Sequence, residues 1–388
     1  MKYSRNQINK AGEILITSLN SEDVNRAIDI IDNWRKLHLP ALDMLYNNII
    51  AIFKKENIQI YFVSRRLKRL SSIQNKLDRN PEMRLGGLQD IGGLRIVVST
   101  MNTLNRMLFI LENNIPEHFE LTKSPVNYIR TPKKTSGYRS VHFIYKYKSE
   151  NPDLDGMKLE LQLRTNLQHS WAMAVETAEL ITKTALKASQ GEEEWLNFFK
   201  IVSSLFAMKE KTPILAEHFE KGYSRKDLLR QLYKLDRTFN IVDTLKALNV
   251  SNYQSTQENH KNGYYVLNIN FIQKKVSIIT FPKDKEADAT AAYSALEKKV
   301  EERKNAVVLV SVPKIQQLQE AYPSYFLDTN NFIRTIETEM NKEIGFLDEK
   351  TFPLFVSEFY PESRNQYAKD EKEFSDLVED NIKKMEEQ

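Results

Sequence analysis

The sequence predicts an α+β protein in which helices precede a sheet and a smaller α+β module follows. Over residues 21–55, apolar side chains recur at three- and four-residue spacing, which is typical of helices. Over residues 159–165, apolar and polar side chains alternate, which is typical of a strand with one polar face. After residue 253, two β-rich runs, a helical segment and a third β-rich run follow.

The first predicted elements are helices, and the last of them carries three candidate functional residues. Helical periodicity over residues 21–55 is interrupted near Pro40 and resumes from residue 41 to 53. The next segment, residues 61–77, has Leu67, Leu70, Ile73 and Leu77 at helical spacing. It predicts a helix with a basic face that carries Arg66, Lys68 and Lys76.

Three strands with polar residues at or beside them are predicted next. Asp90 precedes Gly92 and Gly93, which predict a tight turn before a buried strand at residues 94–98. A basic loop, residues 131–139, leads into a strand at residues 141–147. In the third strand, Glu160, Gln162 and Arg164 alternate with leucines, and a row of such side chains is suited to line a site for a metal and phosphates.

These segments together resemble the RelA/SpoT nucleotidyltransferases. That family carries R-x-K-S-x-x-S-I-x-x-K-L, D-I-x-G-x-R, P-K-x-N-G-Y-x-S-x-H and E-x-Q-x-R-T, and all four have counterparts in this order between Arg66 and Thr165. The resemblance covers about residues 40–190. It implies a mixed-sheet nucleotidyltransferase domain flanked by helices, and transfer of the β,γ-pyrophosphate of ATP to a ribose 3′-hydroxyl with release of AMP.

The resemblance also implies roles for individual residues. It assigns ATP binding to four cations and acceptor binding to six residues: Arg66, Lys68, Lys76 and Arg95 for ATP, and Tyr138, Lys133, Lys134, His142, Gln162 and Arg164 for the acceptor. Asp90 and Glu160 are the expected ligands of Mg²⁺, the expected cofactor, because carboxylates are the hard oxygen ligands it prefers. Glu160 is also the candidate base for the attacking hydroxyl.

Taken singly, each feature has a structural alternative. A basic helix face is usually solvated surface, Asp90 before two glycines can be an ordinary turn residue, and Tyr138 can be a packing residue. The chain also departs from the family pattern twice. Arg69 replaces a serine, and the loop from Pro132 to Tyr138 is one residue longer, which leaves open whether Lys133 or Lys134 faces the phosphates.

Composition limits the class of protein. The 388 residues contain no cysteine, which excludes disulfides and thiolate metal sites, and carry a mild net charge of +4. No run reaches eighteen apolar residues, and the amino terminus lacks the apolar core of a signal peptide. We therefore expect a cytoplasmic protein that makes no membrane contact.

The expected organisation has five parts. Residues 1–60 form a helical lead-in, 61–190 the synthetase core, 191–252 a helical extension, 253–345 a small α+β module and 346–388 a helical arm. Nothing in the module is suited to catalysis. Tyr322 and Tyr325 in it are similar in spacing to an element of CapRel-like fused toxin–antitoxin proteins that blocks the ATP site, although two such tyrosines are more often packing residues.

Three functions remain open on this sequence. The acceptor can be the 3′ end of tRNA, which would make the chain a translation-arresting toxin in anti-phage defence, restrained by its own module. It can instead be GDP or GTP, with (p)ppGpp as product. The alternative from another class is a non-catalytic nucleotide sensor, against which the intact Asp90 and Glu160 argue. The resemblance to CapRel-like proteins implies a phage structural protein as the trigger.

Overall fold

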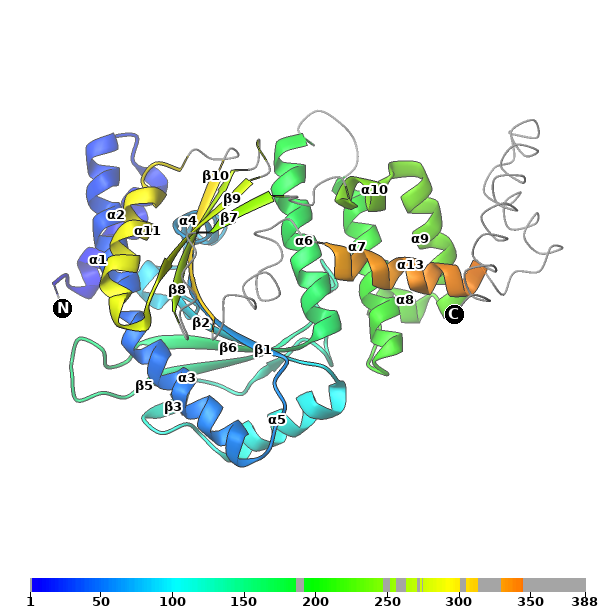
Figure 1. Ribbon diagram of the computed structural model, residues 1–388, viewed down its shortest axis with the longest axis horizontal. Helices are drawn as coiled ribbons and strands as arrows, with labels where there is room; N and C mark the ends of the chain where they lie inside the picture. The colour runs from blue at the N-terminus through cyan, green and yellow to red at the C-terminus, as the bar shows by residue number, and fades with distance from the viewer. Residues whose placement is uncertain are drawn as a thin grey trace.

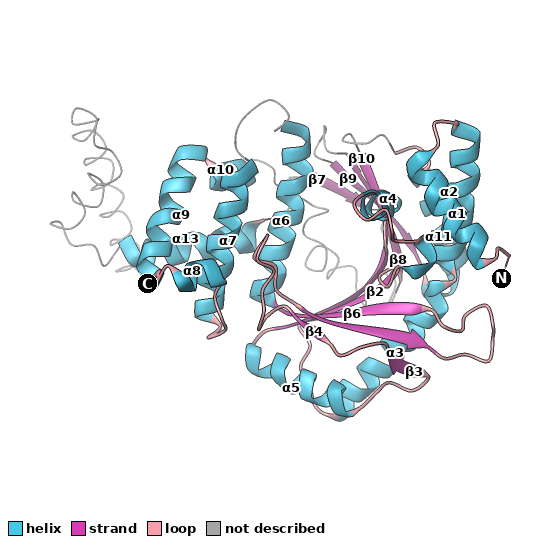
Figure 2. Ribbon diagram, turned by 180° about the vertical axis from the view of Figure 1, so that it is seen from behind, coloured by secondary structure: helices cyan, strands magenta, loops and turns pink. Residues whose placement is uncertain are grey.

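The computed structural model of the protein describes residues 2–185, 192–246, 252–255, 263–270, 273, 275–300, 305–312 and 329–344 (Figure 1). A curved sheet lies at the centre, with the amino-terminal helices on one side and a helical bundle on the other (Figures 1 and 2). In the part of the chain that the structure describes, no helix is long and apolar enough to cross a membrane.

Three helices form the amino-terminal segment: α1 (Arg5–Thr17), α2 (Ser21–Lys36) and α3 (His38–Lys55). The helices predicted within residues 21–55 are confirmed, and the break between them falls at Leu37. Pro40 lies in the first turn of α3, where its missing N–H has no partner to lose, so it does not interrupt the helix.

The sheet is mixed, as predicted. Its strands are β1 (Phe62–Leu67), β2 (Gly92–Val98), β3 (Phe119–Leu121), β4 (Val126–Asn127), β5 (Val141–Tyr147), β6 (Lys158–Thr165), β7 (Asn252–Ser255), β8 (Tyr264–Asn270), β9 (Lys275–Phe281) and β10 (Asn305–Ser311). They lie in the order β3-β5-β6-β2-β1-β10-β8-β9-β7, with β4 beside β5. The pairs β2–β6 and β7–β9 are parallel and the others are antiparallel.

The single helix predicted over residues 61–77 is wrong in its first half. Residues Phe62–Leu67 form β1, and the helix α4 spans only Leu70–Asp78. Strand β1 is paired on both sides, with β2 and with β10, so tertiary hydrogen bonding overrides the local helical spacing. Arg66 therefore lies on a strand, and Lys76 lies on the following helix.

The tight turn predicted at Gly92 and Gly93 is also wrong, because both residues are the first residues of β2. A Cβ atom on Gly92 would lie 2.6 Å from the Leu159 side chain on the neighbouring strand β6. Glycine is needed here for close packing between strands and not for a turn.

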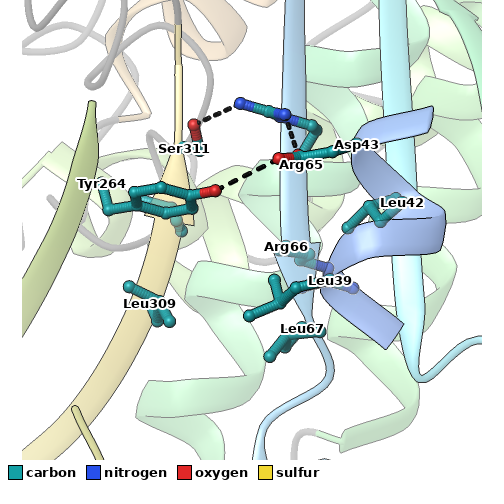
Figure 3. Close-up of a pocket in the computed structure, with 10 residues that line it drawn as sticks. Leu39, Leu42, Asp43, Arg65, Arg66, Leu67, Tyr264, Leu309 and Ser311 are labelled. Carbon is teal, nitrogen blue, oxygen red and sulfur yellow. Dashed lines mark hydrogen bonds and ion pairs between the residues drawn. The ribbon is translucent and has the colours of Figure 1, made fainter. Parts of the chain in front are cut away.

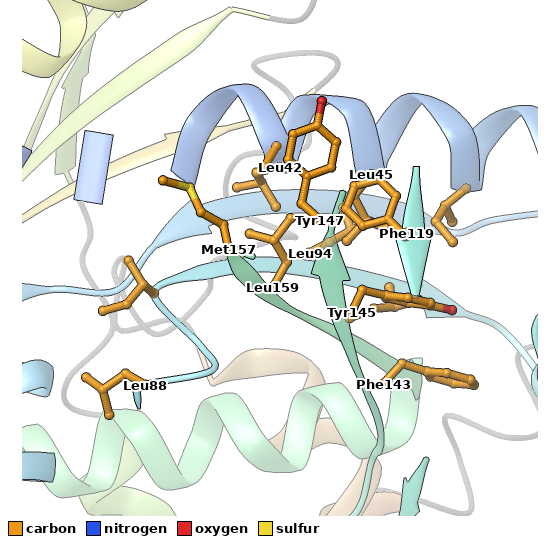
Figure 4. Packing of buried hydrophobic residues seen from close by; sticks show 14 of the residues in the cluster. Leu42, Leu45, Leu88, Leu94, Phe119, Phe143, Tyr145, Tyr147, Met157 and Leu159 are labelled. Carbon is orange, nitrogen blue, oxygen red and sulfur yellow. The ribbon is translucent and has the colours of Figure 1, made fainter. Parts of the chain in front are cut away.

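One face of the sheet packs on the main core. Leucines and aromatic residues of β2, β5 and β6 meet α3 and α5 (Met101–Asn113), as Figure 4 shows for Leu42, Leu94, Phe143 and Leu159. Because side chains alternate along a strand, the polar residues of β6 are placed on the opposite face.

A helical bundle follows the sheet of the synthetase core. It contains α6 (Asn166–Ala185), α7 (Glu192–Lys209), α8 (Ala216–Glu220), α9 (Arg225–Phe239) and α10 (Ile241–Lys246). Helices α9 and α10 are separated at Asn240, which has left-handed backbone angles. Helix α13 (Asn330–Ile344), which the sequence assigned to the carboxy-terminal module, packs Phe332 into this bundle core instead.

The module after residue 253 continues the central sheet. The predicted hairpin is confirmed as β8 and β9, and α11 (Glu286–Glu297) and β10 follow, with a 3₁₀ turn at Lys283–Lys285 before α11. Strand β10 pairs with β1, and Figure 3 shows polar contacts at this junction. Arg65 pairs with Asp43 and donates to Ser311 at 2.8 Å, and Tyr264 donates to Asp43 at 3.3 Å. Tyr322, Tyr325 and the predicted arm at 346–388 lie outside the described residues.

Candidate active site

Strand β6 is an inner strand of the sheet, with β2 on one side and β5 on the other. Its polar side chains therefore have neighbours on both adjacent strands. Gly93 is level with Glu160, and Arg95 and His142 are level with Gln162, so these residues line one surface. Gly93 places only hydrogen beside Glu160. The face therefore has an open position next to the carboxylate that the sequence identifies as the candidate base.

Glu160 is held in place by two hydrogen bonds. His142 Nδ1 lies 2.8 Å from one carboxylate oxygen, and Gln162 Nε2 donates to the other at 2.6 Å. Burial alone would raise the pKa of Glu160, but these hydrogen bonds and the positive charges of His142 and Lys76 outweigh it and lower the pKa to about 2. Glu160 is therefore ionised at neutral pH. Burial would lower the pKa of His142, but Tyr138 and Glu160 outweigh it and raise the pKa.

Tyr138 is linked to the same network through its hydroxyl group. Its oxygen lies 2.8 Å from His142 Nε2 and accepts a hydrogen bond from Arg164 at 2.5 Å. The side chain is half-buried and meets Tyr128 edge to face, with ring centroids 5.8 Å apart. The ring is thus held by its neighbours.

The environment of Tyr138 leads to a spectroscopic prediction. Burial would raise its pKa, but Arg164 and His142 outweigh burial and lower the pKa to about 8. We expect the difference in ultraviolet absorbance between wild type and Tyr138→Phe to show one tyrosinate forming near pH 8. Because the folded-state pKa is below the unfolded value, Tyr138 should add stability as pH rises from about 8 to about 10. An ionisation at or above the usual tyrosine pKa would contradict this prediction.

Asp90 forms the centre of a second cluster. Lys68 Nζ lies 2.7 Å from one of its carboxylate oxygens and Lys76 Nζ lies 3.0 Å from the other. Burial would raise the pKa of Asp90, but the two ammonium groups outweigh it and lower the pKa. The cluster is electrostatically coupled to Glu160, since Glu160 acts on the pKa of Asp90 and Lys76 on that of Glu160.

A third group of charges lies where α6 faces the sheet. Arg69 donates to Glu176 at 3.2 Å, and Arg66, Arg95 and Arg164 also act with Arg69 to lower the pKa of Glu176, although burial would raise it. Arg69, which replaces the serine of the family pattern, thus pairs with Glu176 of α6, whereas Lys68 pairs with Asp90. Arg95 is buried on β2, with its guanidinium 3.9 Å from the sulfur of Met173.

The loop before β5 is fixed against helix α7. Gly137 has a φ of 83°, its carbonyl accepts a hydrogen bond from Ser203 at 2.5 Å, and a Cβ atom there would lie 2.9 Å from the Ser203 side chain. Lys133 Nζ lies 5.0 Å from the Tyr128 ring centroid and 5.3 Å from that of Tyr138. Lys134 is exposed. Of the two lysines, Lys133 is the one that the structure places over the aromatic pair.

The sequence interpretation missed two residues of this site. Tyr128 contacts both Tyr138 and His142, and an aromatic residue beside Arg130 and Lys133 could have indicated it. Glu176 is the counter-charge for Arg69, and its position about three turns into the helix after β6 was the available signal.

Asp90 and Glu160 are the residues that could hold a divalent cation. Within the described ranges, no cluster of three or more metal-ligating side chains is present. Two ionised carboxylates suit Mg²⁺, which usually takes one or two carboxylates plus phosphate oxygens and water. They do not suit a cation that needs an all-protein cage.

The site lies within a region of the chain that matches a known family. Residues 65–185 match the family model described as the region found in RelA / SpoT proteins. The small alarmone synthetase 2 from Bacillus subtilis is 24% identical, with a TM-score of 0.38 over 49% of this chain and 98% of its own. A GTP pyrophosphokinase family protein from Streptococcus pneumoniae is 23% identical, with a TM-score of 0.38 over 52% and 96%. The small alarmone synthetase 1 from Bacillus subtilis, bound to its product pppGpp, is 22% identical, with a TM-score of 0.38 over 49% and 96%. No curated protein matches.

Ionised carboxylates beside a group of lysines and arginines are suited to phosphoryl transfer from ATP. The family match covers the whole of this arrangement, from β1 to α6. Residues 65–185 therefore form a RelA/SpoT domain, and this domain supports a pyrophosphokinase, an enzyme that transfers pyrophosphate from ATP.

Proposed function

We propose that this chain transfers the β,γ-pyrophosphate of ATP to the 3′-hydroxyl at the end of tRNA, and that it thereby arrests translation as a toxin. The observation that carries the catalytic part is the network in which His142 and Gln162 hold an ionised Glu160 beside the cluster of Asp90, Lys68 and Lys76. It supplies a proton acceptor and cations for a triphosphate on one face of the sheet.

In the proposed reaction, the acceptor 3′-oxygen bonds to the β-phosphorus of ATP and the bond from that phosphorus to the α-phosphate oxygen breaks. The hydroxyl proton passes to Glu160, and AMP leaves. Because the pKa of Glu160 is low, its carboxylate is a weak base. The proton therefore passes to it favourably only as the new bond to phosphorus makes the hydroxyl group more acidic. Arg66, Lys68, Lys76 and Arg95 are proposed to bind ATP, and Mg²⁺ held by Asp90 and Glu160 would neutralise charge on its phosphates.

For the acceptor, we propose Tyr138, Lys133, Lys134, His142, Gln162 and Arg164 as contacts. Support for tRNA comes from the segment that leads into β5, which exposes four cations: Lys123, Arg130, Lys133 and Lys134. An extended run of cations suits a polynucleotide backbone, and an unpaired 3′ end can stack on aromatic rings. The family match favours a second candidate, GDP or GTP as acceptor with (p)ppGpp as product.

The acceptor is identified by offering deacylated tRNA, GDP and GTP separately with ATP labelled at its β-phosphate. We expect the label in tRNA, and none in tRNA that ends in 3′-deoxyadenosine. A tRNA ending in 2′-deoxyadenosine is the matched control and should still be labelled. Label found in guanine nucleotides but not in tRNA would replace the first candidate by the second.

Replacing Tyr138 with Ala should weaken acceptor use far more than ATP binding. The change removes an aromatic surface worth about 1–3 kcal/mol in base stacking, and also the hydroxyl that holds Arg164 and His142. Tyr138→Phe separates the two effects, because it keeps the ring. The KM for the acceptor and the Kd for ATP should be measured in both variants; an equal loss of ATP affinity in Tyr138→Ala would place this residue on the donor side.

As part of the same proposal, residues 253–345 restrain the enzyme until a phage structural protein binds. Tyr322 and Tyr325, which resemble the blocking element of CapRel-like proteins, are the candidates for occupying the ATP site. A link between the module and the site supports this proposal, because β10 of the module pairs with β1, the strand that carries Arg66.

A further inference from the structure

A buried polar cluster joins the carboxy-terminal module to the amino-terminal helices. Arg35 of α2 has a side chain only 2% exposed and pairs with Asp32 at 2.9 Å and with Glu297 of α11 at 2.7 Å. Tyr293 of α11 contacts both Arg35 and Glu297 through its hydroxyl group. Helix α11 lies beside α2 in both ribbon views (Figures 1 and 2). The cluster fixes Glu297 firmly, because a buried charge without its partner is costly.

The second carboxylate oxygen of Glu297 reaches the start of α4. It accepts a hydrogen bond at 3.1 Å from the backbone N–H of Leu70, which is 227 positions away in the sequence. Arg69 is the N-cap residue of α4, but its side chain makes no capping hydrogen bond and pairs with Glu176 instead. The first turn of α4 also contains no acidic residue. Glu297 therefore supplies the hydrogen-bond acceptor that α4 lacks at its amino terminus.

Helix α4 is nine residues long, and its position determines where two cations of the site lie. Lys68 is two residues before its start, and Lys76 is in its last turn; both contact Asp90. Isolated helices of this length are marginal, so the order of α4 depends on packing and on its cap. Its packing is provided by Ile73 and Leu77, which are buried in the main core.

We propose that Glu297 is a positioning residue for ATP binding, which acts by capping α4 from the carboxy-terminal module. The inference rests on the proposed use of Lys68 and Lys76 for ATP. It makes part of the module a structural component of the donor site, and this role is distinct from the restraint proposed for Tyr322 and Tyr325. A partner that displaced α11 would loosen the helix that carries Lys76.

Two substitutions in the full chain separate the cap from the charge. Glu297→Gln keeps a side-chain oxygen at the same reach but loses the negative charge. Glu297→Asp keeps the charge near Arg35, but is one methylene too short to reach the Leu70 N–H. Lys298→Ala is the matched control, because Lys298 is the C-cap residue of the same helix and pairs with Asp29 of α2 at 2.7 Å. The readouts are the Kd of α,β-methylene-ATP with Mg²⁺ by calorimetry and the hydrogen exchange of the first-turn amides of α4.

We expect Glu297→Asp to weaken binding of the analogue about fivefold, as for loss of a helix cap, and to speed exchange in the first turn of α4. Glu297→Gln should stay within about twofold of wild type in both readouts, as should Lys298→Ala. Wild-type affinity in Glu297→Asp, an equal loss in Glu297→Gln, or no analogue binding by the wild type would overturn the inference. If the wild type binds the analogue with this dependence on Glu297 but transfers pyrophosphate to no acceptor, the proposed function fails and the positioning role stands.

Discussion

Glu160→Gln is expected to lower the rate of pyrophosphate transfer on the order of a hundredfold or more while the protein stays folded. The substitution removes the ionised carboxylate that accepts the proton and would bind Mg²⁺. It leaves the opposite face of β6 unchanged, where Leu159, Leu161 and Leu163 form part of the main core. Transfer rate and thermal unfolding should be measured on the same preparations.

Glu120→Gln provides the matched control for this variant. Glu120 lies on β3 of the same sheet and pairs on the surface with Lys146 and Lys148. It loses the same charge away from the site, so its transfer rate should equal that of wild type. A rate for Glu160→Gln within about twofold of wild type would refute the role assigned to this strand, since loss of a catalytic proton acceptor typically costs far more.

A fragment of residues 1–252 is expected to fold poorly and to have little activity. It lacks β10, which pairs with β1, and it uncovers Phe62 and Val97, which pack against β8 and β10. Arg35 also loses Glu297, and removing one partner of a buried ion pair typically costs about 3–5 kcal/mol. Size-exclusion chromatography and thermal unfolding of the fragment and the full chain would measure the effect. A monomeric fragment with the stability and activity of the full chain would show that the module is separable.

Because truncation removes part of the scaffold, the proposed restraint is better tested in the full chain. Tyr325→Ala should then bind ATP more tightly and be toxic when expressed, while the combination of Tyr325→Ala with Glu160→Gln should be harmless. Harmless growth with Tyr325→Ala alone would argue against the restraint.

Local pattern predicted most of the elements that carry the site. The alternation at Glu160–Arg164 predicted β6, and the apolar runs predicted β5, the β8–β9 hairpin and β10. The errors occurred where distant segments decide the structure. The helical spacing over residues 61–77 does not predict β1, because the pairing of β1 with β10 joins Arg65 to Ser311, which are 246 positions apart. The sequence predicts the module as a separate unit for the same reason, since it does not show that β10 pairs with β1 of the core.

The order of the four motifs predicted which residues gather on one face, but not how they contact one another. That Lys68 and Lys76 share Asp90, or that His142 holds Glu160, depends on side-chain distances set by the sheet register. Tyr128 and Glu176 belong to the site through contacts across strands and helices, and neither lies within the four motifs.

The most direct test of the central claim compares ATP labelled at the α-, β- or γ-phosphate in reactions with purified protein, Mg²⁺ and each acceptor. Pyrophosphate transfer predicts that β- and γ-label move together to the acceptor and that α-label appears in AMP, all dependent on Glu160. Movement of γ-label alone with ADP as product, movement of α-label to the acceptor, or equal product from Glu160→Gln would contradict it.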